Sequence, residues 1–313
     1  MRRVEVSEFG GRKSLTLTTA SVPEPAAHEV LVRIHAAGVN PYDWMTREGN
    51  GADVDLPWVP GWDFSGVITA VGDDVTGFHV DDGVFGMLAD ERGTYTEFAA
   101  IPATNLVRKP RTIPHTVAAG APMAALTAWQ ALFDVGRLRP TQRVLIHAAA
   151  GGVGHLAVQL ASWIGAYTIG TASSSNEAYL DDIGLDKFVN YREERFEDVV
   201  SPVDLVVDAV GGDTFERSIE VLTTDGRISK LPGPLTADES DLLARSGVSG
   251  TYPVVQWRPE QLRTVAQLLD DDGLDVRIDS VLPLDRAAAA HRRSESGHAR
   301  GKVVLQMPTG RPS

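Results

Sequence analysis

The stretch at residues 146–161, IHAAAGGVGHLAVQLA, constrains the fold more than any other part of the sequence. It begins as an apolar run, breaks into small residues and glycines, and then resumes with apolar positions at helical spacing. A strand that turns sharply into a helix leaves the first N–H groups of that helix unpaired and exposes the positive end of its dipole. Such a turn suits an anion, and a phosphate group is the obvious candidate.

Strand-like and helix-like stretches alternate around this turn, from about residue 122 to 259. Regular alternation predicts a doubly wound parallel sheet, so we expect an α/β protein. The first 121 residues instead show short β-prone runs separated by turn signals, which is typical of a β-rich, barrel-like unit. Residues 260–313 return to that first unit through helix, strand, helix and final strand. We therefore predict two domains, one formed by 1–121 with 260–313 and the other by 122–259.

Charge and composition exclude several classes of protein. The net charge of −13 argues against a nucleic-acid partner, which would need a basic stripe. The sequence shows no secretory h-region and no apolar run of about 18 residues, so we expect a cytoplasmic protein with no membrane partner. The absence of cysteine excludes disulfides, cysteine nucleophiles and thiolate zinc sites.

The glycine turn has the spacing of a dinucleotide fingerprint, with Ala148 in place of the first glycine. Gly151 would let the backbone approach a pyrophosphate, and Gly154 would let the helix pack closely on the strand. The alternative is a glycine-rich turn with no ligand. The candidate cofactor-binding residues here are Ala148, Gly151, Gly152, Val153 and Gly154.

The end of the next strand discriminates between the two nicotinamide cofactors. A carboxylate there would accept hydrogen bonds from the ribose of NAD, but this sequence has Ser173 and Ser174. Hydroxyls and nearby cations hold a 2′-phosphate, so the site favours NADPH. Tyr191 and Arg192, after the third strand, are the expected further contacts. The alternative is a solvated loop with no ligand.

Several short sequence segments together resemble those of a known protein family. The sequence is similar, in order and spacing, to the zinc-independent quinone oxidoreductase branch of the medium-chain dehydrogenase/reductase superfamily. This resemblance implies a GroES-like catalytic domain made from both chain ends, a central Rossmann domain and an active site in the cleft between them. The phrases that carry it are AGVNPYDW, PGWDFSGVITAVGDDVTGF, PMAALTAWQAL, VLIHAAAGGVGHLAVQLA, VDLVVDAVGGDTFERSIEVL and SGHARGKVVL.

The resemblance also implies roles for single residues. Asn40 and Tyr42 would line the catalytic side of the cleft, Asp63 its wall, and Thr127 the surroundings of the nicotinamide. Asp63 could instead cap a turn, and Thr127 could be an ordinary helix-start hydroxyl. The further cofactor contacts that the resemblance implies are Gly211, Gly212 and Lys302, the last of which could equally begin a solvated strand.

The sequence departs from the zinc-dependent relatives. Asn40 stands where their first cysteine ligand falls, GWD at residues 61–63 replaces their Gly-His-Glu, and the eight histidines show no ligand spacing. Gly51 stands where related enoyl reductases carry a tyrosine, which leaves Tyr42 or water as the proton source. We expect an NADPH-dependent, zinc-independent reductase of quinones or α,β-unsaturated carbonyls.

Two other functions stay open at this point. One is an enoyl reductase that acts on a polyketide-like or acyl intermediate, and the other is a non-catalytic protein that binds or senses NADPH. The resemblance also implies a homodimer, for which the edge segment at residues 246–255 is the candidate contact.

Overall fold

The computed structural model describes residues 1–88 and 92–308, and the chain divides into two compact units. Unit 1 comprises Met1–Met123, Trp257–Asp272 and Val276–Ser313, and unit 2 comprises Ala124–Gln256 and Gly273–Asp275. The chain passes from unit 1 to unit 2 within helix α3 (Pro122–Trp129). None of the helices found in 1–88 and 92–308 is long and apolar enough to cross a membrane.

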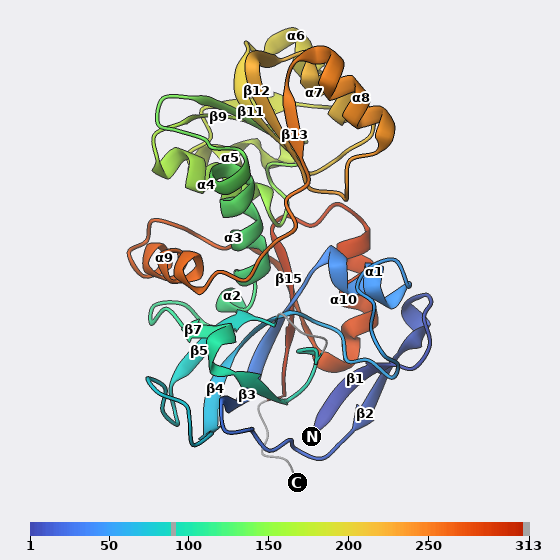
Figure 1. The fold of residues 1–313 in the computed structure, drawn as a ribbon, viewed down its shortest axis with the longest axis vertical. Coiled ribbons are helices and arrows are strands. Elements are labelled where there is room, and N and C mark those ends of the chain that lie inside the picture. Colours follow the sequence, from blue (N-terminus) through green and yellow to red (C-terminus); the bar gives the residue numbers. More distant parts are fainter. Residues whose placement is uncertain (89–91, 309–313) are drawn as a thin grey trace. The chain divides into compact units, whose positions relative to one another are not determined.

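Unit 1 is built on strands from both ends of the chain (Figure 1), which pair antiparallel except for the parallel pair β14–β15. Its strands are β1 (Arg2–Val6), β2 (Leu15–Thr19), β3 (Glu29–Val39), β4 (Asp63–Val71), β5 (Gly83–Met87), β6 (Phe98–Pro102), β7 (Leu106–Arg108), β14 (Ile278–Pro283) and β15 (Lys302–Gln306). Its helices are α1 (Pro41–Arg47), α2 (His115–Ala118), α9 (Pro259–Asp270) and α10 (Ala287–Glu295), with short 3-10 turns at Arg12–Ser14, Ala103–Asn105 and Leu284–Arg286.

The main sheet of unit 1 has the order β14-β15-β3-β4-β5-β7, and β6 also pairs with β3. Strand β3 lies at its centre because alternate residues of an extended apolar segment can fill the core, as Val30, Val32 and Ile34 do. The last strand, β15, runs antiparallel beside β3, so residues more than 260 positions apart in sequence become neighbours (Figure 1).

Unit 2 is a parallel sheet with helices between its strands. The strands are β8 (Arg143–Ile146), β9 (Tyr167–Ala172), β10 (Lys187–Asn190), β11 (Val203–Asp208), β12 (Leu222–Lys230) and β13 (Ser249–Thr251). The helices are α4 (Gly154–Trp163), α5 (Glu177–Asp182), α6 (Phe196–Val199), α7 (Asp213–Ile219) and α8 (Ala237–Ser246), with a π-helical turn at Gln130–Val135 and a 3-10 turn at Ser174–Asn176.

The order of these strands is β10-β9-β8-β11-β12-β13, which is 3-2-1-4-5-6 in chain order and defines a Rossmann sheet. In such a sheet, ligands bind outside the carboxyl ends of the strands where the order reverses, here between β8 and β11. The apolar residues of the central strands, among them Leu145, Val206 and Ile228, are buried against Phe215 of α7.

The predicted α/β fold class is therefore confirmed: a Rossmann sheet accompanies a separate β-rich unit. The strand expected within residues 246–255 is shorter than the segment, since β13 covers Ser249–Thr251 and ends the sheet beside β12. Val254 lies beyond the strand and is exposed.

One buried histidine locks the carboxyl ends of β8 and β9 to α7. His147 follows β8, and its Nδ1 and Nε2 lie 3.0 and 2.9 Å from the hydroxyls of Thr171 and Ser218. The Ser218 hydroxyl donates to the carbonyl of Thr214, so it accepts from Nε2–H of His147. Burial, reinforced by the Arg217 charge, lowers the pKa of His147 to about 3.

We expect His147 to make the stability of the protein sensitive to acid. The unfolded histidine titrates near pH 6.5, so the unfolded chain binds the extra proton first and stability is lost as the pH falls below that value. Each pH unit should cost up to about 1.4 kcal/mol from this one group. Urea unfolding at several pH values between 7.5 and 4 should show a steeper loss for the wild-type chain than for His147→Gln. Parallel pH profiles would contradict this assignment.

Candidate functional site

A buried polar cluster forms where three neighbouring strands of unit 1 begin or end. Asn40 follows the last residue of β3, Asp63 opens β4 and Lys302 opens β15. Because β4 and β15 both run antiparallel to β3, the start of each lies beside the end of β3. The register of the sheet therefore brings together three residues that the sequence separates.

Hydrogen bonds join the members of this cluster. Asn40 Nδ2 donates to Asp63 Oδ2 over 3.0 Å, and Lys302 Nζ donates to Asn40 Oδ1. The backbone N–H of Met123 donates to Asp63 Oδ1 over 2.8 Å, so both carboxylate oxygens of Asp63 are occupied. Lys302 Nζ lies 3.9 Å from Asp63 Oδ2, which makes an ion pair without a direct hydrogen bond. Burial raises the pKa of Asp63 and lowers that of Lys302.

A second carboxyl adjoins this cluster at the start of α1. Asp43 Oδ2 accepts hydrogen bonds from the backbone N–H of Asn40 at 2.7 Å and from the Tyr95 hydroxyl at 3.0 Å. Asp43 Oδ1 has no hydrogen-bond partner among the residues that the structure describes. Burial raises the pKa of Asp43 to about 7, although these donors oppose the shift. The sequence analysis missed this residue, which the Asn-x-x-Asp spacing of a capping box could have indicated.

Beyond Asp43, a directed chain of hydrogen bonds crosses to α10. Arg47 can only donate, so His291 Nδ1 accepts from it at 3.1 Å and the proton of the neutral ring is on Nε2. This Nε2–H faces the Tyr95 hydroxyl at 3.2 Å, and that hydroxyl donates to Asp43. Glu295 accepts from Arg47 at 2.8 Å and balances its buried charge. These hydrogen bonds anchor α1, which carries the predicted site residue Tyr42.

The remaining predicted catalytic residues have less buried positions. Tyr42 is 38% exposed, and its ring lies 5.4 Å from that of Trp62. Thr127 is half-buried on α3 and belongs to unit 2, whereas Asn40, Tyr42 and Asp63 belong to unit 1.

The glycine turn of unit 2 has the geometry that a close approach to an anion requires. Ala148 has φ of +51°, in the left-handed region where a glycine would be unstrained. A Cβ on Gly154 would lie 2.3 Å from the Ala148 carbonyl oxygen, so no larger residue fits there. His155 holds the turn through its Nδ1, 2.8 Å from the Gly151 carbonyl oxygen. Gly152 and Val153 complete the turn before α4 begins at Gly154.

The strand register places the predicted phosphate contacts next to each other. Asn190 of β10 pairs with Ala172 of β9, so Tyr191 and Ser173, the residues that follow each strand, lie side by side. Ser173 Oγ accepts from Asn176 Nδ2 at 3.0 Å, and Ser174 is exposed next to it. The Arg192 guanidinium lies 5.7 Å from the ring centre of Tyr191, which is 53% exposed.

A third loop follows β11 beside the glycine turn. Asp208 Oδ1 accepts from the N–H groups of Val210 and Gly211 at 2.8 and 2.9 Å. Gly211 and Gly212 both have positive φ, +77° and +57°, which this tight loop demands. Asp208 Oδ2 is buried with no partner in the described part of the chain, and it could accept a ligand hydroxyl.

These three loops fit a phosphorylated dinucleotide. The start of α4 offers backbone N–H groups, the end of β9 offers hydroxyls and a guanidinium, and the sequence TASSSN brings no carboxylate to repel a phosphate. Lys302, the other predicted cofactor contact, belongs to unit 1, where it bonds to Asn40.

No metal centre is found among the described residues. Residues 1–88 and 92–308 contain no group of three or more His, Asp or Glu side chains that could hold a metal ion. The eight histidines are spread over both units, and His147, His155 and His291 are buried in hydrogen bonds to protein groups.

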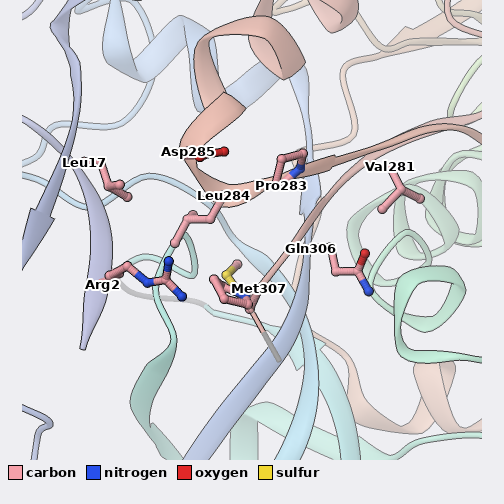
Figure 2. Close-up of a pocket in the computed structure, with 9 residues that line it drawn as sticks. Arg2, Leu17, Val281, Pro283, Leu284, Asp285, Gln306 and Met307 are labelled. Carbon is pink, nitrogen blue, oxygen red and sulfur yellow. The ribbon is translucent and has the colours of Figure 1, made fainter. Parts of the chain in front are cut away.

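A cavity of about 410 Å³ also opens in unit 1, as Figure 2 shows, at the strand pair β1–β2 and the strands β14 and β15. Its lining contains no predicted site residue, so it is separate from the cluster around Asn40. The lining residues are Arg2, Leu17, Val281, Pro283, Leu284, Asp285, Gln306, Met307 and Pro308.

A Rossmann sheet with its glycine turn and a GroES-like unit in the same chain define the medium-chain dehydrogenase/reductase class. Residues 26–111 match the family "Alcohol dehydrogenase GroES-like domain", and residues 183–305 match the family "Zinc-binding dehydrogenase". The quinone oxidoreductase of Mus musculus is 30% identical to the chain over 98% of both proteins. The 2-methylene-furan-3-one reductase of Solanum lycopersicum is 30% identical over 97% of this chain and 79% of that protein.

A solved structure agrees with these matches. The Escherichia coli quinone oxidoreductase, solved in complex with NADPH, superposes with a TM-score of 0.88 at 28% identity, covering 98% of this chain and 100% of the other. The chain belongs to the quinone oxidoreductase branch of the medium-chain dehydrogenase/reductase superfamily.

Two glycine substitutions in the turn should differ in their effect on stability. Gly154→Ala places a methyl group against backbone atoms and should cost about 1–3 kcal/mol of unfolding free energy. In Gly151→Ala the nearest atom to the new Cβ is the Ala148 carbonyl oxygen at 3.1 Å, so stability should stay within about 1 kcal/mol of wild type. Urea unfolding measures both variants. Equal destabilisation would contradict the close helix–strand packing at Gly154.

Proposed function

We propose that this chain is an NADPH-dependent oxidoreductase that reduces quinones or α,β-unsaturated carbonyl compounds without zinc. The observation that carries the proposal is the set of donors at the carboxyl ends of β8, β9 and β10, which suits a dinucleotide with an extra phosphate. The NADPH complex of the Escherichia coli relative supports the choice of cofactor, and the names of the relatives from mouse and tomato support the two acceptor classes.

Residues of this chain would bind the parts of NADPH and position the acceptor. Gly151 and the N–H groups at the start of α4 would hold the pyrophosphate, and Ser173 with Arg192 would hold the 2′-phosphate. Asp208 Oδ2 would accept a ribose hydroxyl. NADPH, when bound, supplies a hydride. Asn40 and Tyr42 would position the acceptor, and the proton would come from water or from Tyr42.

We propose a reaction without zinc because of the side chains in the cluster of Asn40, Asp63 and Lys302. An ammonium group in hydrogen-bond contact with Asn40 occupies the space that a cation would need and repels it. Quinones and conjugated enones accept hydride more readily than simple carbonyls and need less polarisation of their oxygen. This reasoning favours these acceptors over alcohols as substrates.

Titration with the two cofactors tests the phosphate contacts. NADPH should bind more tightly than NADH by about 1.5–3 kcal/mol, roughly ten- to a hundredfold, as hydrogen bonds to a charged group provide. Arg192→Gln should remove most of this preference. Arg195 lies in the same loop as Arg192, and its guanidinium pairs with Glu197 of α6. Arg195→Gln is therefore the matched control and should retain the preference. Equal affinity of the wild-type chain for NADPH and NADH would contradict the proposal.

A substrate panel tests the chemistry. With NADPH the purified chain should reduce a quinone and an enone, EDTA should leave the rates unchanged, and ethanol with NADP⁺ should be inert. Tyr42→Phe should cost less than about tenfold on the quinone if water supplies the proton, against about 10²- to 10⁴-fold if Tyr42 does. Turnover restricted to enoyl thioesters would favour an enoyl reductase of biosynthetic intermediates, and cofactor binding without any turnover would favour a sensing protein.

We also propose that the chain acts in the cytoplasm as a homodimer in which β13 pairs with its symmetry mate. Strand β13 ends the parallel sheet, and an unpaired edge invites pairing with a second copy. Sedimentation at micromolar concentration should show a dimer. A monomeric wild-type chain under these conditions would contradict the proposal.

A further inference from the structure

We propose that Lys302 is a catalytic residue of the proposed reduction: its buried ammonium group, with the amide of Asn40, binds the carbonyl oxygen of the acceptor. There it would stabilise the negative charge that develops during hydride transfer. This inference rests on the proposed function and replaces the expected role of Lys302 as a cofactor contact. Lys302 and Asn40 carry N–H donors for which the described residues provide no acceptor.

The ammonium group of Lys302 has more donors than the protein satisfies. A lysine carries three N–H donors, and within the described residues the Lys302 ammonium makes one hydrogen bond, to Asn40 Oδ1. The nearest carboxylate oxygen, on Asp63, is 3.9 Å away and lies outside hydrogen-bond range. Lys302 is only 4% exposed, so bulk water does not satisfy the other donors. Unmet buried donors are costly, and an oxygen atom of a ligand would satisfy them.

The orientation of Asn40 follows from its two partners. Lys302 can only donate, so the amide oxygen of Asn40 faces it, and the amide nitrogen faces the carboxylate of Asp63. One Nδ2 hydrogen is used by Asp63, and in the described part of the chain the second has no acceptor. The amide is also polarised between a cation and an anion, which strengthens this remaining donor.

The side chains of this cluster favour an oxygen atom of a ligand over a cation. Asp63 compensates the charge of Lys302 but has both of its oxygens occupied, by Asn40 and by the N–H of Met123. Within the described residues the cluster therefore offers a ligand N–H donors from Lys302 and Asn40, and the adjoining Asp43 Oδ1 is an acceptor without a partner. Because these donors are fixed by strand ends before any ligand arrives, they need no reorganisation during the reaction.

This arrangement matches the charge that forms on a conjugated acceptor. When a hydride adds to the β-carbon of an enone, the carbon–carbon π electrons move into a new C=C bond and the carbonyl pair moves onto oxygen, giving an enolate. A quinone that takes the hydride at a ring carbon likewise gives an enolate, which becomes the hydroquinone when the proton of that carbon moves to the remaining carbonyl oxygen. In both cases NADPH becomes NADP⁺, and one proton from water or Tyr42 completes the product. Donors aimed at such an oxyanion commonly contribute 10²- to 10³-fold to the rate.

The test compares Lys302→Met with Lys302→Arg on one quinone and one enone. Lys302→Met should lower kcat by about 10²- to 10³-fold, with a smaller change in KM, and should leave the Kd for NADPH, measured by fluorescence titration, within about twofold of wild type. Lys302→Arg keeps the cation and its donors and should recover at least about tenfold of the lost rate.

A charge-balanced double variant separates catalysis from folding. Lys302→Met alone leaves the buried carboxylate of Asp63 without a counter-ion, which could itself destabilise unit 1. Lys302→Met combined with Asp63→Asn removes both charges and should restore Tm toward the wild-type value while kcat stays low. Recovery of kcat together with Tm would show a structural ion pair and overturn the proposal.

Two other results would overturn it. A rise in the Kd for NADPH by the same factor as the loss of kcat would assign Lys302 to the cofactor, and a kcat for Lys302→Met within about threefold of wild type would leave it no part in the reaction. If the wild-type chain turned over no acceptor, the proposed function itself would fail. A wild-type chain that reduces both acceptors keeps that function intact whichever way the lysine variants behave.

Discussion

The antiparallel register of β15 against β3 and of β3 against β4 is the constraint on which the polar interior of unit 1 depends. It places a lysine, an amide and a carboxylate at adjacent strand ends, where burial makes each of them costly alone. Asp63 offsets the charge of Lys302, and Asn40 bridges the two. A one-residue shift of β15 would turn the Lys302 side chain to the other face of the sheet and leave Asp63 uncompensated.

Unit 2 is organised around a parallel sheet and carries the buried carboxylate of Asp208 at the end of β11. Its strands are all parallel, so their carboxyl ends share one edge of the sheet, and the loops that follow β8, β9, β10 and β11 lie together there. The turn after β8 requires a glycine at position 154 because the helix backs directly onto the chain at Ala148. Neutral His147 behind this turn joins β8, β9 and α7.

Local patterns were enough to predict unit 2, whereas the interior of unit 1 needed long-range pairing. The turn at Gly151, the serines after β9 and the helix at Gly154–Trp163 each follow from periodicity and spacing within a short window. The link between Asn40 and Lys302 spans most of the chain, and no local pattern reports which strands will be neighbours. The chain from Asp43 to His291 was missed for the same reason, since its members lie on separate elements.

The overall charge of the protein bears on which molecules can use these sites. At a net charge of −13 the long-range field opposes anions, but at physiological salt this field is screened beyond about 8 Å. A phosphorylated cofactor must therefore gain its binding energy from contacts at short range, as the loops after β8, β9 and β10 can provide. An uncharged acceptor avoids the long-range penalty altogether. It acquires negative charge only in the transition state, where fixed N–H donors are most effective. Neutral quinones and enones meet both conditions, whereas a carboxylate-bearing acceptor would meet the repulsion in its ground state.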